Sequence, residues 1–184
     1  MIVFSYIVLS LLLSVFILLF FIFGIDALRG HDMATSKRVI KVLVKIIKEH
    51  NPGTHRFYDL GCGRGSVVLV IKKEFPLFMV YGIDNNIVRI FFSKLRSKFL
   101  RRKIIFKKQN IFNVDLKNVD IIYAYLWYEL MPPLEKKLRK ELKQGAIVVT
   151  NTSRFLTWKP IKTYIVHPEN PDFEKLFVYI KTSN

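Results

Sequence analysis

Hydrophobic positions follow two different patterns along the chain. Residues 2–25 form an apolar run without a charged side chain, IVFSYIVLSLLLSVFILLFFIFGI. A helix of this length spans about 36 Å at about 1.5 Å per residue, enough to cross a hydrocarbon core of about 30 Å. From residue 37 onwards, apolar and polar residues instead alternate with the periods of helices and strands. We therefore predict a transmembrane helix over 2–25, a linker over 26–36 and a folded domain over 37–184.

A cleaved signal peptide is the alternative interpretation of the N-terminal segment. Signal peptides have a basic start, a shorter apolar core and a small-residue cleavage site. Here only Met1 precedes the run, and FFIFGIDALRG contains no small-x-small site. Basic residues follow the run, beginning with Arg29, Lys37 and Arg38, and the positive-inside rule places that side in the cytoplasm. The pattern favours a single-pass membrane protein with a cytoplasmic domain.

The domain alternates predicted strands with predicted helices. Helical spacing of apolar residues predicts helices over 36–50, 66–73, 86–100 and 133–142, the first capped by Thr35 or Ser36 and ended by Asn51-Pro52-Gly53. Short apolar runs predict strands over 56–60, 78–83, 103–106, 119–126, 146–150, 162–166 and 175–181. Such alternation is typical of an α/β fold with a mostly parallel sheet and helices on both faces. Because no helix separates the last two strands, we predict an antiparallel hairpin at the C-terminal edge.

Charge and cysteine content narrow the functional classes. Lys and Arg number 30 against 14 Asp and Glu, and all of them follow residue 25. The densest cluster, SKLRSKFLRRKIIFKK at residues 93–108, suits either a solvated surface or anionic lipid headgroups. It lacks the interleaved aromatic residues of single-strand binders, so nucleic acid is not favoured. One cysteine excludes a disulfide framework, and four scattered histidines give no metal-ligand spacing: His31, His50, His55 and His167.

The chemical signal lies in the loop Asp59-Leu-Gly-Cys-Gly-Arg-Gly65, which follows a predicted strand and precedes a predicted helix. Glycines let this backbone turn sharply and approach a ligand closely. The dinucleotide pattern G-x-G-x-x-G would require glycine at Ser66, and no Gly-Lys-Ser/Thr follows as in a P-loop. Twenty-three residues after Gly61, Asp84 ends the next predicted strand, where a carboxylate can accept both hydroxyls of a ribose.

The loop together with Asp84 resembles the class I S-adenosylmethionine-dependent methyltransferases, over about residues 35–184. The resemblance implies a Rossmann-like methyltransferase sheet and S-adenosylmethionine as cofactor. It places Asp59 near the methionine amino end, Asp84 on the ribose, and Asn110 with Ile111 near the adenine. The implied cofactor-binding residues are Asp59, Leu60, Gly61, Cys62, Gly63, Gly65, Asp84, Asn85, Asn110 and Ile111. We interpret Cys62 as a small packed residue and not as a nucleophile.

A narrower resemblance concerns the C-terminal half. It is similar to the membrane-anchored lysine methyltransferases of the mitochondrial ATP synthase c-subunit and adenine nucleotide translocase, and to their archaeal relatives. The residues that carry it are Leu134, Lys137, Leu138, Gly145, Ala146, Arg154, Phe155, Trp158 and Pro160. The chain departs from this group at Cys62 and Arg64, where the group often has Ser and Asp, and at Ala34-Thr35-Ser36.

Methyl transfer to an amine requires a neutral lysine held in line with the methyl group, which an aromatic-lined channel favours. The segment after the fourth predicted strand supplies the candidates. Tyr125, Tyr123 and Glu129 are the catalytic candidates, with Tyr125 preferred. Tyr128, Trp127 and Arg154 are the substrate-binding candidates. The alternatives are core packing for the aromatic residues and a cap on the sheet end for Arg154.

These patterns predict a membrane-anchored enzyme that methylates a lysine of a membrane-associated protein. Three other functions fit the same residues. The first is methylation of a lipid headgroup or small amine, and the second is methylation of RNA. The third is a membrane-bound interaction module with a methyltransferase fold but no catalysis, although the intact loop argues against the loss of cofactor binding.

Overall fold

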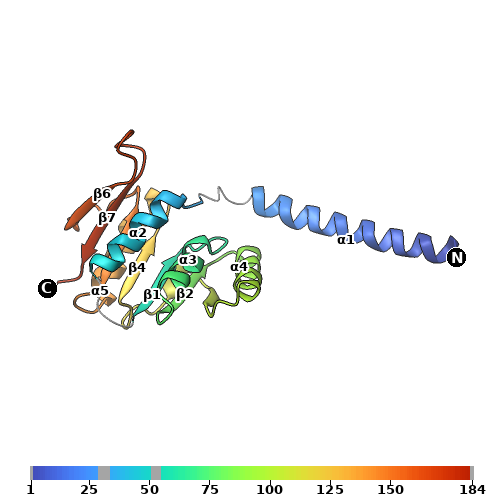
Figure 1. The fold of residues 1–184 in the computed structure, drawn as a ribbon, viewed down its shortest axis with the longest axis horizontal. Coiled ribbons are helices and arrows are strands. Elements are labelled where there is room, and N and C mark those ends of the chain that lie inside the picture. The colour runs from blue at the N-terminus through green and yellow to red at the C-terminus, as the bar shows by residue number, and fades with distance from the viewer. Residues whose placement is uncertain (1, 29–33, 51–54, 183–184) are drawn as a thin grey trace. The chain divides into compact units, whose positions relative to one another are not determined.

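The chain forms two compact units in the computed structural model, which describes residues 2–28, 34–50 and 55–182. The first unit, residues 1–33, contains the single helix α1 (Ile2–Leu28), and the second, residues 34–184, contains the sheet (Figure 1). The helix extends three residues beyond the predicted span of 2–25. Part of the predicted linker, His31 and the predicted Asn51-Pro52-Gly53 stop lie outside the described residues.

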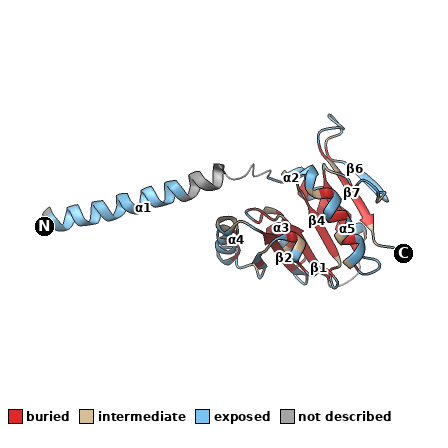
Figure 2. Cartoon of the chain, turned by 180° about the vertical axis from the view of Figure 1, so that it is seen from behind, coloured by how far each residue is buried: buried red, intermediate tan, exposed pale blue. Residues whose placement is uncertain are grey.

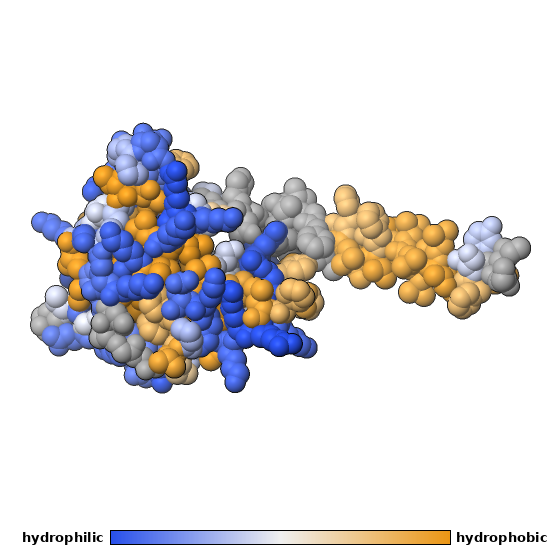
Figure 3. All heavy atoms as spheres, in the orientation of Figure 1, coloured by the Kyte–Doolittle hydropathy of each residue, from blue (hydrophilic) through white to orange (hydrophobic). Residues whose placement is uncertain are grey.

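Within α1, residues Val3–Phe21 form a stretch long and apolar enough to cross a membrane. Their side chains are exposed (Figure 2) and hydrophobic (Figure 3). The hydroxyls of Ser10 and Ser14 donate to the carbonyls of Ile7 and Ser10 at 2.9 and 2.8 Å, which satisfies them within the helix. A signal sequence near the N-terminus can meet the same criteria of length and hydrophobicity, so these criteria alone do not distinguish the two.

The second unit is built on a seven-stranded sheet. Its strands are β1 (Arg56–Leu60), β2 (Met79–Asp84), β3 (Ile105–Lys108), β4 (Ile121–Ala124), β5 (Ile147–Asn151), β6 (Lys162–Ile165) and β7 (Lys175–Ile180). They lie in the order β3-β2-β1-β4-β5-β7-β6. The first five are parallel, whereas β7 is antiparallel to both β5 and β6. This confirms the predicted α/β fold with an antiparallel C-terminal hairpin.

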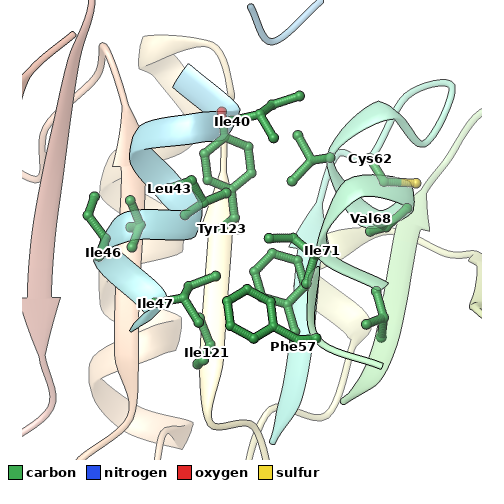
Figure 4. Close-up of a cluster of buried hydrophobic side chains, with 14 of the residues drawn as sticks. Ile40, Leu43, Ile46, Ile47, Phe57, Cys62, Val68, Ile71, Ile121 and Tyr123 are labelled. Carbon is green, nitrogen blue, oxygen red and sulfur yellow. The ribbon is translucent and has the colours of Figure 1, made fainter. Parts of the chain in front are cut away.

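Helices cover both faces of the sheet: α2 (Lys37–Glu49), α3 (Ser66–Glu74), α4 (Ile87–Phe99) and α5 (Met131–Glu141). Two short 3-10 turns, η1 (Ile111–Asn113) and η2 (Tyr128–Leu130), follow β3 and β4. On one face, α2 and α3 pack their apolar residues onto β1 and β4, and Figure 4 shows Leu43 and Ile47 of α2 near Phe57 and Tyr123 of the strands. On the other face, α5 packs onto a second apolar cluster.

Element boundaries differ from the predictions where tertiary pairing decides them. The fourth strand was expected over 119–126 but ends at Ala124, which pairs with Leu60 of β1 and Thr150 of β5. The next residues leave the sheet and lead into η2, so Tyr125 and Leu126 belong to a loop. The third strand was expected over 103–106 but lies two residues later, because Ile105 pairs with Tyr81 of β2.

Candidate active site

The glycine loop after β1 is tightly folded. The amides of Gly61 and Cys62 both donate to the carbonyl of Ile83 at 2.9 Å, which ties the loop to the end of β2. Gly61 has φ +85°, and a Cβ there would lie 2.7 Å from Cδ2 of Leu126. Gly65 has φ +76° at the start of α3. Both positions favour glycine because the left-handed conformation strains other residues, and Gly61 also lacks room for a side chain.

Asp84 lies at the end of β2 with its side chain only 4% exposed. Its two oxygens accept hydrogen bonds from the backbone amides of Gly63 and Asn86 at 2.9 and 2.8 Å. A carboxylate has about four lone-pair positions, so these bonds leave capacity for two more donors. The side chain is thereby oriented, with acceptors left for the vicinal hydroxyls of a ribose.

Asp59, near the end of β1, lies close to Asp84 and is buried, with 2% of its surface exposed. Burial, and secondarily the negative charge of Asp84, raises the pKa of the Asp59 carboxyl to about 8. A cationic group placed here would lower that pKa and stabilise the carboxylate. Asp59 therefore suits an ammonium group, such as the one at the methionine end of S-adenosylmethionine.

Cys62 belongs to the same loop and is buried within reach of both carboxyl charges. Burial, and then the charges of Asp59 and Asp84, raises the pKa of its thiol. The neutral thiol is a poor nucleophile. These facts support the interpretation of Cys62 as a packed residue.

The remaining predicted cofactor residues lie at the same edge of the sheet. Asn85 directly follows Asp84 and is exposed. Asn110 and Ile111 follow β3, whose Lys108 pairs with Asp84. The side-chain oxygen of Asn110 accepts from the amide of Phe112 at 3.0 Å and so begins η1. Because the three strands are parallel, their carboxyl ends bring Asp59, Asp84 and Asn110 to one edge.

The two tyrosine candidates near the end of β4 have different environments. Tyr123 pairs in register with Asp59 and is buried in the core, and its hydroxyl lies 3.2 Å from that of Thr35, just before α2. Burial raises the pKa of Tyr123. Tyr125 is half-buried in the loop, and burial followed by the charge of Glu174 raises its pKa. Both hydroxyls therefore stay protonated at neutral pH.

The other four candidates lie on the surface. Trp127 precedes η2, and Tyr128 and Glu129 are within it, all three exposed. Arg154 is exposed in the segment after β5. Of the six predicted catalytic and substrate residues, the structure buries Tyr123, half-buries Tyr125 and exposes the rest.

Asn151 at the end of β5 is a buried polar residue that the sequence analysis did not single out. Burial raises the pKa of Tyr123, and a hydrogen bond with the side chain of Asn151 lowers it by a smaller amount. Asn151 ends a strand parallel to β4, at the same edge of the sheet as Asp59 and Asp84. The only signal in the sequence was an amide directly after an apolar strand.

Glu135 on α5 was also missed. Its buried carboxylate accepts from the amides of Leu156 and Trp158 at 2.9 and 2.5 Å, and from the amide and hydroxyl of Thr157 at 3.2 and 2.5 Å. Burial alone would raise its pKa, but these hydrogen bonds outweigh burial and lower it. Glu135 thereby holds the segment that follows Arg154. A carboxylate on the apolar face beside Leu134 and Leu138 was the available signal.

Metal binding finds no support in the described residues, where no group of three His, Cys, Asp or Glu side chains is placed to hold a metal ion.

Solved structures share this fold. An RNA methyltransferase from Salinibacter ruber, crystallised with S-adenosyl-L-homocysteine, superposes with a TM-score of 0.73 at 18% identity, covering 83% of this chain and 95% of that one. The magnesium protoporphyrin IX methyltransferase of Synechocystis PCC 6803, with S-adenosylmethionine bound, gives a TM-score of 0.63 at 12% identity, covering 86% and 91%. Together with a family-model match over residues 59–162, the fold and the glycine loop identify an S-adenosylmethionine-dependent methyltransferase.

The chain belongs to the family described as the ANTKMT methyltransferase domain, which matches residues 59–162, more than half of the chain. A protein-lysine N-methyltransferase of Saccharolobus islandicus is 26% identical over 148 residues, covering 79% of this chain and 90% of that protein. The lysine N-methyltransferase of the ATP synthase c-subunit from Mus musculus is 29% identical over 133 residues, covering 71% of this chain. The chain spans about half (51%) of the mouse protein's length. These matches confirm the predicted family, enzyme class and cofactor.

Proposed function

We propose that this methyltransferase transfers the methyl group of S-adenosylmethionine to a lysine amine of a protein in or beside a membrane. The family match over residues 59–162 carries the proposal. The archaeal protein-lysine N-methyltransferase supports it, because the similarity extends over most of both chains. The mouse relative, named for a lysine in the ATP synthase c-subunit, supports a protein substrate as well.

In the proposed mechanism, the residues at the carboxyl edge of the sheet hold the cofactor. Asp84, oriented by two backbone amides, would accept the ribose hydroxyls, and the buried Asp59 would hold the ammonium group. The glycine loop, with Leu60 and Cys62, would line the cofactor. Asn85 would lie beside Asp84 near the ribose, and Asn110 and Ile111 near the adenine. The bound cofactor supplies an electrophilic methyl group.

The substrate lysine must lose its proton before it attacks, and exclusion of water lowers its pKa. In our proposal the half-buried Tyr125 hydroxyl contacts the amine and directs its lone pair. Tyr123 stays protonated in the core and positions this end of β4 through Thr35. Glu129, at the surface, accepts the proton that the lysine releases. Trp127, Tyr128 and Arg154 contact the substrate chain.

We further propose that α1 anchors the enzyme in the membrane with the second unit in the cytoplasm. The exposed apolar stretch Val3–Phe21 supports a membrane span, and the basic residues that follow support this orientation. In this arrangement residues 2–25 span the bilayer, 26–36 link the two units and 37–184 form the catalytic domain. Anchoring raises the effective concentration of membrane substrates without any new contact.

Methyl-labelled S-adenosylmethionine tests the proposal. The full chain in lipid nanodiscs is incubated with membrane proteins, and protein hydrolysates are analysed for methyl-lysine by mass spectrometry. We expect methyl-lysine with the native chain and none with Asp84→Ala. Tyr125→Phe should lower kcat at least tenfold with unchanged cofactor affinity, whereas the control Tyr164→Phe, on the edge strand β6 and outside the proposed site, should keep a similar kcat.

The distribution of label separates the alternatives. Label extracted into organic solvent, with none in protein, would replace lysine by a lipid headgroup as the acceptor. Label recovered only in RNA would replace lysine by RNA as the methyl acceptor. Cofactor binding without any labelled product would indicate a non-catalytic interaction module.

A further inference from the structure

Helix α4 buries an unusual face. The residues it turns toward the sheet are Ile90, Ser93 and Ser97, and two of these three side chains are small and polar. The hydroxyl of Ser93 donates to the carbonyl of Gly63 at 3.0 Å, and that of Ser97 donates to the carbonyl of Arg102. The packing of α4 therefore consumes little of its apolar surface.

Four of its large apolar side chains are exposed instead. Ile87, Phe91, Leu95 and Phe99 are 59%, 60%, 53% and 86% exposed. At about 100° per residue, each step of four residues advances by about 40°, so these four cover an arc of about 120°. That arc lies opposite the face formed by Ile90, Ser93 and Ser97. We call these four side chains the outward apolar ridge.

Positive charge borders the ridge. Residues 85–108 contain nine Lys and Arg and no Asp or Glu. Lys94 and Lys98 flank one side of the ridge, and Arg101 and Lys103 follow its end, all of them exposed. Within the part of the chain that the structure describes, Lys94 and Lys98 form no salt bridge. In Figure 3, hydrophobic and hydrophilic atoms lie side by side over the region of α4.

We propose that α4 docks on an anionic lipid surface, with the outward apolar ridge inserted among the headgroups and the flanking lysines on lipid phosphates. An apolar face bordered by Lys and Arg is the pattern of helices that lie in a membrane interface. A second copy of this chain is a poor occupant, because it would bring two strongly basic surfaces together.

The chain connection adds a second argument, which rests on the membrane anchoring proposed above. Residues 29–36 join α1 to α2, and eight residues reach at most about 29 Å when extended. A domain on so short a tether meets the bilayer surface constantly. The ridge and its charges are observations independent of that anchor.

Docking through α4 has a consequence for the active site. Ser93 contacts the carbonyl of Gly63, and Arg96 donates to the carbonyl of Arg64 at 2.7 Å. The docking helix thus directly supports the glycine loop that binds the cofactor. The proposal therefore assigns α4 the role of fixing the orientation of that loop relative to the membrane.

A fluorescent probe on the ridge tests the proposal in the full chain. An environment-sensitive dye is attached to Phe99→Cys, and to Phe173→Cys as a matched control, because Phe173 is 61% exposed outside α4. The chain without an added cysteine corrects for labelling of the buried Cys62. The proteins are reconstituted in phosphatidylcholine vesicles with or without 30% phosphatidylglycerol, containing spin-labelled lipid as quencher.

We expect at least twofold stronger quenching at residue 99 than at residue 173, and only in anionic vesicles. Adding Lys94→Gln and Lys98→Gln should reduce the quenching at residue 99 by half or more, while cofactor binding stays unchanged. Equal quenching at the two positions, or quenching that ignores phosphatidylglycerol, would overturn the proposal. The proposal would also be overturned if the dye at residue 99 were shielded from water only by an added membrane protein and were not quenched by the lipid.

Flotation of the same vesicles tests the anchor separately. Proteins that float without selective quenching at residue 99 would retain the anchor and overturn docking through α4. Selective quenching without stable flotation would support α4 and overturn the anchor.

Discussion

Helices α2 and α4 have similar compositions but use their surfaces in opposite ways. Both have 13 residues, and both combine large apolar side chains with several Lys and Arg. The apolar face of α2 is buried on the sheet, through Val39, Ile40, Leu43, Ile46 and Ile47. Four large apolar residues of α4 are exposed, and its buried face consists of Ile90 and two serines.

The environments of their charges differ as well. On α2, Lys45 pairs with Glu49 and Lys48 with Glu74, at 3.8 and 3.6 Å. No acidic residue occurs from 85 to 108 around α4. The comparison teaches that an amphipathic pattern does not by itself tell which face a helix buries. Helix α2 stabilises the fold, whereas α4 directs its apolar surface toward something outside the domain.

The largest expected effect comes from a matched pair of leucine substitutions. Leu43→Ala on α2 should cost about 2–5 kcal/mol of unfolding free energy, because it opens a cavity in the core. Leu95→Ala on α4 should change it by about 0.5 kcal/mol or less, because that side chain is exposed. Denaturant titration of the full chain in detergent micelles, followed by tryptophan fluorescence, measures both. Similar losses at the two positions would remove the contrast between the helices.

A substitution on the buried face of α4 sharpens the contrast. Ser93→Leu should cost about 1–3 kcal/mol through overpacking, since Ser93 is fully buried against the glycine loop. It should also weaken cofactor binding, which calorimetry of the full chain can measure. The matched control Lys94→Leu changes the neighbouring exposed position and should leave both quantities nearly unchanged. If Ser93→Leu changed neither the free energy of unfolding nor cofactor binding, α4 would have to be able to shift away from the sheet.

The pKa of about 8 of the Asp59 carboxyl predicts a pH dependence of stability. Between pH of about 4 and about 8 the native state binds the proton that the unfolded state has lost. The free energy of unfolding therefore falls as pH rises in this window, by at most about 1.4 kcal/mol per unit. Asp59→Asn should remove this slope, as measured by melting temperature at pH 5 to 8.

The exposed Asp172→Asn is the control for Asp59→Asn. Its carboxyl pKa is lowered by Lys175, so this variant should keep the slope that Asp59 causes. A saturating concentration of cofactor should flatten the slope in the native chain, because its ammonium group lowers the pKa of Asp59. A native chain whose stability is constant from pH 5 to 8 would contradict the raised pKa.

The smallest effects concern the two helix starts. Ser36 accepts from the amide of Val39 at 3.2 Å and Asn86 from that of Val88 at 2.8 Å. Ser36→Ala and Asn86→Ala should each cost about 1 kcal/mol, measured by the same titration. The conservative variants Ser36→Thr and Asn86→Asp should restore most of the loss. Equal stability of alanine and native residues would exclude these caps as contributors.

The sequence predicted the features that depend on local pattern. Alternating periodicity predicted the α/β fold, and the absence of a last connecting helix predicted the antiparallel hairpin. The glycine loop and Asp84 could be found because each lies at the carboxyl end of a strand, and parallel strands bring such positions to one edge. The first apolar run was evident from its length alone.

Other features followed only from the tertiary structure. The end of β4 depends on its partners β1 and β5, so the sequence analysis extended that strand over Tyr125. Tyr123 is buried because α2 packs over it. The amides that donate to Glu135 come from a segment about 20 residues further along the chain. Contacts at long sequence separation leave no periodic trace in the chain.

The sequence by itself therefore determined the class of fold, the cofactor loop and the apolar first helix, because spacing along one chain segment encodes each of them. Only the tertiary structure decided which face of α4 is buried and that Asn151 is buried at the end of β5. A helix shows its apolar and polar faces in its sequence. Which of them meets the sheet depends on the shape and hydrogen bonds of the surface that receives it.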